Sequence, residues 1–167
     1  MALSECMNKE QWSQSNDAIE MLVALKEQSE DVFLKRVRSL QRFYIKCCRK
    51  KLFLLSQEEF KNGLDIAEAY ISNRATRKDV SEQNWKTEGE VFGIEYGTDP
   101  IDTANCLKKV RIHTGLSQNK AKEYAVNLGY FIDWTMLYAT DFNGEIPAQY
   151  SRFLLPELLK NEISNPF

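Results

Sequence analysis

The stretch from Ser29 to Leu54 has the spacing of one long amphipathic helix, and it limits the folds that this chain can adopt. At about 100° per residue, its apolar positions follow one stripe. These positions are Phe33, Val37, Leu40, Tyr44 and Cys47. Five cations follow the opposite stripe: Lys35, Arg38, Arg42, Lys46 and Arg49. We predict that residues 29–54 are the central helix of a helical domain, with the apolar stripe buried.

Local capping signals predict most of the other helices. Ser56 with Glu59, and then Thr76 with Asp79, have the spacing of capping boxes. Pro100, directly after Asp99, marks another helix start, because proline suits the first helical position. The predicted helices are a first turn at 9–14, a helix at 18–26, one from the first box to about residue 72, a weaker one carrying Val80 and Trp85, then 100–115, 118–138 and a short helix at 153–159.

The segment 88–98 carries conflicting signals. Glycines recur every fourth residue from Gly89, and each makes a helix less favourable by about 1 kcal/mol. From Phe92 to Tyr96, apolar residues alternate with glycine and glutamate, which favours an extended conformation. We therefore expect a loop with a little strand here.

The length of 167 residues, with 43% hydrophobic and 28% charged residues, fits one globular domain. No apolar run approaches the roughly 18 residues that cross a bilayer, and the first residues lack the pattern of a signal peptide. The cysteines Cys6, Cys47, Cys48 and Cys106 have neither metal-site nor paired spacing, so we interpret them as reduced thiols in a cytoplasmic protein. The sequence predicts an all-α fold, a single compact domain over residues 1–167 with five to seven helices.

The formal net charge of −2 hides an uneven distribution. Residues 29–54 contain eight Lys or Arg and two acids, which gives +6, so the rest of the chain carries −8. Residues 78–102 alone contain seven acids and two lysines. A charge distribution this polarised is informative about partners rather than about the fold.

No set of residues in the sequence points to catalysis, to a cofactor or to a metal ion. The single histidine, His113, is near a predicted helix end, where a surface or capping role is the ordinary one. The chain contains none of the P-loop, GxGxxG, GxSxG and HExxH motifs. We predict a protein that is not an enzyme and that has no cofactor.

The basic stripe of residues 29–54 is the first candidate site, and three interpretations compete. Its cations could be solvated or neutralised within the molecule, for example by the acids of 78–102. They could receive an acidic surface of a protein partner, because charge complementarity steers association. They could also contact nucleic-acid phosphates, although nucleic-acid modules are usually basic overall.

Aromatic residues are more often core than contact surface, and we expect this of Trp12, Trp85 and Trp134. Trp85 also has an alternative interpretation as a contact residue, because it precedes the glycine-rich segment. Together with Phe92 or Tyr96 it could form an interaction loop, which is the second candidate site.

Several pieces of the chain resemble a family of uncharacterised small bacterial helical proteins. The pieces are Glu10-Gln11-Trp12, RVRSLQRFYIKCCRKKLFLL (36–55), GLDIAEAYISNRAT (63–76), Leu158-Leu159 and Asn165-Pro166-Phe167. The middle differs, because family members are often alanine-rich where residues 84–112 of this chain are not. The resemblance implies a helical fold and no activity.

The sequence as a whole therefore predicts a non-enzymatic protein–protein interaction module. Accessory, inhibitory and immunity-type bacterial regulators share its profile of polarised charge without catalytic groups. The predicted partner has an acidic surface and binds the five cations of the basic stripe. The alternative is a nucleic-acid-binding regulator that uses the same stripe.

Overall fold

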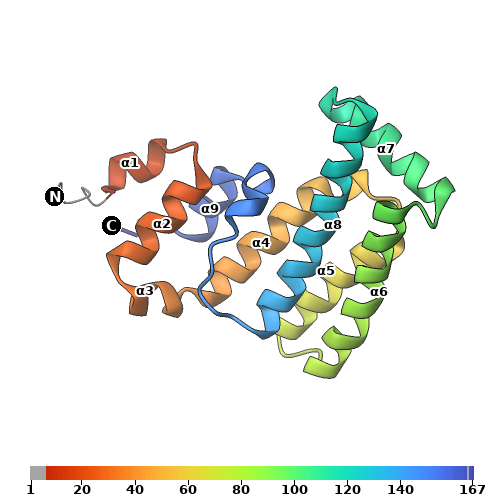
Figure 1. Ribbon diagram of the computed structural model, residues 1–167. Helices are drawn as coiled ribbons and strands as arrows, with labels where there is room; N and C mark the ends of the chain where they lie inside the picture. The colour runs from red at the N-terminus through yellow and green to blue at the C-terminus, as the bar shows by residue number, and fades with distance from the viewer. Residues whose placement is uncertain (1–6, 165) are drawn as a thin grey trace.

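Nine α-helices and two 3₁₀ helices make up the part of the chain that the computed structural model describes, residues 7–164 and 166–167 (Figure 1). These residues contain no β-strand, which confirms the all-α prediction. The α-helices are α1 (Lys9–Gln14), α2 (Ala18–Gln28), α3 (Glu30–Lys35), α4 (Val37–Lys51), α5 (Glu58–Ile71), α6 (Arg77–Tyr96), α7 (Pro100–Thr114), α8 (Gln118–Thr140) and α9 (Pro156–Glu162), and the 3₁₀ helices are η1 (Leu52–Leu54) and η2 (Ala148–Phe153). Cys6 and Asn165 lie outside the described residues.

The centre of the fold is occupied by α8, and α4 lies beside it (Figure 1). α8 contacts α4, α5, α6, α7 and η2. Three small residues at intervals of four, Ala121, Ala125 and Gly129, are fully buried along it or nearly so. Small side chains let neighbouring helices approach closely, so α8 can be surrounded on several sides.

The stretch 29–54 is not one helix, because the chain bends at Arg36 and the last three residues of the stretch form a 3₁₀ helix. Arg36, with φ −93° and ψ 14°, ends α3 and begins α4, and η1 follows α4. The predicted apolar stripe nevertheless faces the core on both sides of the bend, since Phe33 and Leu40 are fully buried. Nothing in the local sequence marks the bend; α3 follows the surface of α2, against which it packs. The predicted number of five to seven helices is therefore too low, because the bend divides one predicted helix in two and short helices form near both ends of the chain.

The prediction of a loop with a little strand at 88–98 is wrong, because most of this segment is the second half of α6. Val91 and Ile94 are fully buried at helical spacing, and this burial outweighs the cost of the glycines. The helix ends at Gly97, whose φ of +67° is the left-handed conformation that glycine adopts without strain.

Of the three predicted capping signals, two are correct and one is wrong. The Thr76 box and the Asp99 cap with Pro100 form as predicted. The Ser56 box does not form, since α5 begins after Gln57 without a side-chain cap. The backbone N–H of Ser56 instead donates to Cys106 Sγ on α7 at 3.3 Å, which fixes the linker before α5.

The C-terminal segment returns to the N-terminal helices (Figure 1). The Phe167 ring lies 5.8 Å from the ring of buried Trp12, edge to face, and the Gln28 side chain donates to the Pro166 carbonyl at 3.0 Å. Upstream of this segment, α9 packs on α4. This placement brings an acid of α9 to the basic residues of α4.

Candidate protein-interaction surfaces

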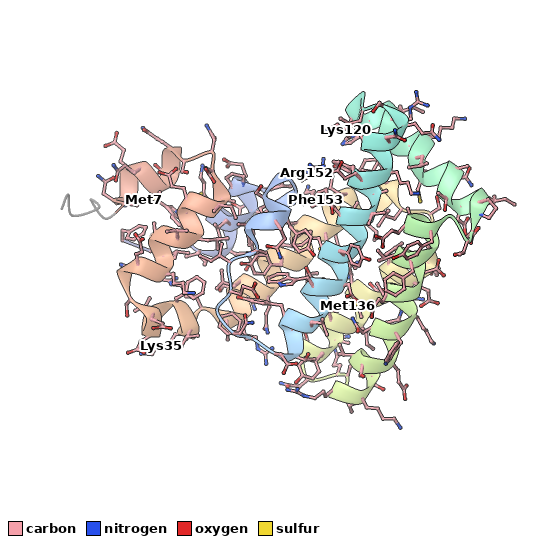
Figure 2. All side chains as sticks on the ribbon, in the orientation of Figure 1. Met7, Lys35, Lys120, Met136, Arg152 and Phe153 are labelled. Atoms are coloured by element: carbon pink, nitrogen blue, oxygen red, sulfur yellow. The ribbon has the colours of Figure 1, made fainter. Side chains whose placement is uncertain are left out.

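The basic stripe predicted from the sequence is divided between two helices. Lys35 lies on α3, at the lower left of the molecule in Figure 2, while the other four cations lie on α4. No described carboxylate forms an ion pair with Lys35 or Arg38. Arg38 donates to the side chain of buried Gln41 at 3.1 Å. Gln41 donates in turn to the carbonyls of Tyr138 and Ala139, so it satisfies acceptors at the end of α8.

Glu162 of α9 neutralises two cations of the stripe. Its carboxylate pairs with Arg42 Nε at 3.2 Å and with Lys46 Nζ, and its side chain is only 8% exposed. Burial acts to raise the pKa of Glu162, but the hydrogen bonds and charges of Lys46 and Arg42 outweigh it, so this pKa is lowered. Arg42 and Lys46 on α4 therefore bind α9 through its Glu162 carboxylate.

Arg49 is held by two acids of α5. Its guanidinium lies 2.9 Å from Asp65 Oδ1 and 2.9 Å from Glu68 Oε2, with a further bond from Nε to Glu68 Oε1 at 3.2 Å. Neutralisation within the molecule thus occurs at three of the five cations. The carboxylates come from α5 and α9 and not from residues 78–102, because the helix that carries most of those acids, α6, packs on α5 and α8.

Replacing Glu162 with glutamine should lower the free energy of unfolding by about 1 kcal/mol at pH 7, since two half-exposed cations lose a charged partner. Chemical denaturation of both proteins measures this. Because the Glu162 pKa is lowered below 4.5, the difference should persist above that pH and vanish as the pH falls through the lowered pKa. Glu157, exposed on the same helix and paired with Lys160, is the control; its change to glutamine should cost less than about 0.5 kcal/mol. Equal effects of the two changes would contradict this role of Glu162.

The second candidate site is an exposed aromatic face of α6, which consists of Trp85, Phe92 and Tyr96. Intervals of seven and four residues place the three rings on one side of the helix. Trp85 is 75% exposed, Tyr96 72% and Phe92 41%. The ring centroid of Phe92 lies 6.2 Å from that of Tyr96 and 6.5 Å from that of Tyr130 on α8. Gly89 lies on the same face with no neighbouring atom within 4 Å of where a Cβ would be.

This aromatic face corrects two of the sequence expectations. Trp12 is buried and Trp134 packs against the core, as predicted, but the core interpretation of Trp85 is wrong. Trp85, Phe92 and Tyr96 belong to a helix capped at both ends rather than to a loop. The helix therefore holds the three rings at a fixed spacing.

Three carboxylates, those of Glu88, Glu95 and Asp133, lie beside the aromatic face where α6 packs on α8. This group was not identified from the sequence. Tyr130 donates to Glu95 Oε2 at 2.6 Å, and the side chain of Asn84 donates to Asp133 Oδ1. Burial, and then the nearby charge of Glu88, raise the pKa of Asp133 to about 6. Only the packing of α8 on α6 brings Tyr130 and Asp133 here, and no local sequence pattern indicates it.

The described residues also bear on a metal site, on a membrane span and on the role of His113. They hold no group of three or more His, Cys, Asp or Glu side chains placed to bind a metal ion. Nor do they include a helix with the length and apolar character needed to cross a membrane. His113 is exposed beside Phe53, with Lys51 Nζ 3.1 Å from its Nε2, which agrees with a surface role.

Comparison of the chain with protein-family models, with curated proteins and with solved structures found no match in any of the three.

Proposed function

We propose that the protein is a non-enzymatic protein–protein interaction module and that the aromatic face of α6 is its docking surface. The observation that carries the proposal is the exposure of two large aromatic side chains, Trp85 and Tyr96, on one face of a well-capped helix. Tryptophan and tyrosine are enriched among the residues that contribute most to binding energy at interfaces. A contiguous exposed apolar patch is a mark of an interaction site.

The basic stripe supports this proposal less than the aromatic face does. Arg42, Lys46 and Arg49 already have carboxylate partners, so an acidic partner or a phosphate would have to compete with them. Lys35 and Arg38 are the two cations of the stripe that lack a described carboxylate partner.

The test is capture of partners from host lysate, with and without nuclease, by the native protein and two double variants. Changing Trp85 and Tyr96 to alanine should weaken retention of a nuclease-resistant protein partner by more than about tenfold. Changing Lys35 and Arg38 to glutamate should leave it unchanged. Circular dichroism and the thermal midpoint check that both variants keep the fold, which we expect because all four side chains are exposed.

The same experiment can refute the proposal in two ways. If the partner is lost only with the Lys35 and Arg38 variant, the docking surface is the basic stripe. If only nuclease-sensitive material is retained, the nucleic-acid alternative replaces the interaction module.

A further inference from the structure

Granting the proposed function, we infer that the partner segment is basic and that it lays arginine or lysine side chains on the aromatic face of α6. The chemistry of the rings, the position of the carboxylates beside them and the lack of internal counter-ions support this inference independently of one another.

The first support is the position of Glu88 and Glu95 relative to the rings. Glu88 is three residues after Trp85 and four before Phe92, and Glu95 is three residues after Phe92. Side chains three and four residues apart on a helix are neighbours, so each carboxylate lies beside an exposed ring. A partner that covers the rings will also cover, or closely approach, these carboxylates.

The second support is that these acids have no cation of their own. Among the described residues, no lysine or arginine forms an ion pair with Glu88, Glu95 or Asp133. The acids near α4 are different, because Glu162, Asp65 and Glu68 are all paired. Burial is the largest cause of the raised pKa of Asp133, and the nearby charge of Glu88 raises it further. A partner cation would relieve this repulsion.

The third support is the preference of the rings themselves. A guanidinium or ammonium group over the face of a tryptophan, tyrosine or phenylalanine is attracted by the quadrupole of the ring, and arginine can also stack on it. A purely apolar partner would desolvate the carboxylates without compensation. An acidic protein surface or a phosphate backbone would be repelled by them.

The chemistry of the partner can be tested with two defined peptides. One alternates arginine with leucine, and the other has glutamate in place of each arginine. We expect the arginine peptide to bind, to change the tryptophan fluorescence and to shift backbone NMR resonances of α6 and of Tyr130. We expect the glutamate peptide to do none of these. Changing Trp85 and Tyr96 to alanine should weaken binding of the arginine peptide by about tenfold or more.

Charge variants separate the carboxylate contribution from that of the rings. Changing Glu88 and Glu95 to glutamine should lower the affinity for the arginine peptide by about five- to tenfold. It should also remove much of the salt dependence of binding. Glu123, exposed on α8, is the matched control, and its change to glutamine should leave binding unchanged. The inference is overturned if the arginine peptide does not bind, if it binds away from α6, or if the Glu88 and Glu95 variant binds as the native protein does.

The two proposals fail in different ways. Suppose that the captured partner is lost with the Trp85 and Tyr96 variant but is retained in full by the Glu88 and Glu95 variant. This result would contradict the inference that the partner segment is basic, but not the proposal of an interaction module. A captured partner that neither variant weakens would overturn both.

Discussion

Replacing Phe131 with alanine should lower the free energy of unfolding by about 3–5 kcal/mol, because a fully buried ring leaves a cavity that its neighbours cannot fill. Phe131 is on α8, and its ring lies 5.9 Å from the Phe153 ring with an angle of 11° between the planes. It also lies 5.1 Å from the Tyr150 ring and 6.3 Å from that of Trp134. Phe153 and Tyr150 belong to η2, so the cluster attaches the segment after α8 to the core.

Urea denaturation followed by circular dichroism measures this loss. Leucine at position 131 keeps most of the buried volume and should cost clearly less than alanine. The matched control is Phe92, the same residue type 41% exposed on α6, whose change to alanine should cost less than about 1 kcal/mol. Equal costs at positions 131 and 92 would show that the aromatic cluster does not hold η2 to α8.

Features that depend on adjacent residues could be predicted from the sequence. The Thr76 box, the Asp99 cap with Pro100 and the stop at Gly115, which has a φ of +72°, each need only a few neighbouring residues. The apolar stripe from Phe33 to Cys47 was also identified correctly, because four of its five residues are fully buried and Val37 is partly buried.

Features that depend on tertiary packing could not be predicted in this way. The bend at Arg36 has no glycine or proline to mark it. In the second half of α6, burial of Val91 and Ile94 decides in favour of helix over the alternation of Phe92 and Tyr96.

The candidate sites show the same division. The three aromatic residues of α6 were singled out from the sequence, but their exposure on one helix face required the fold. Glu162 pairs with Arg42 across 120 positions of sequence, and the partners of Arg49 are on a different helix. A charge count predicts that neutralisation is available, but only the packing of α5 and α9 shows which acids provide it.

Replacing Gly129 with alanine should destabilise the protein, although alanine is the better helix former by about 1 kcal/mol. A Cβ at position 129 would lie 2.9 Å from Val91 Cγ2 and 3.3 Å from Phe60 Cε1. Both neighbours are fully buried, and the valine methyl group is too close to its own backbone to move away easily. Overpacking of this kind typically costs about 1–3 kcal/mol, so after the gain of about 1 kcal/mol in helix propensity we expect a net loss of up to about 2 kcal/mol in the free energy of unfolding.

Two other glycines provide the comparison for Gly129. Gly89 on α6 has nothing within 4 Å of the position of a Cβ, so alanine there should stabilise the protein by about 0.5–1 kcal/mol. At Gly63 a Cβ would lie 2.7 Å from Met136 Sδ and 3.0 Å from Oγ1 of buried Thr87, so alanine there should destabilise the protein as well. Chemical denaturation of the three alanine variants gives the order. If Gly129→Ala were as stable as Gly89→Ala, the close approach of α6 and α5 to α8 would be incorrect, and the surface that α6 shares with Tyr130 and Asp133 would be in doubt with it.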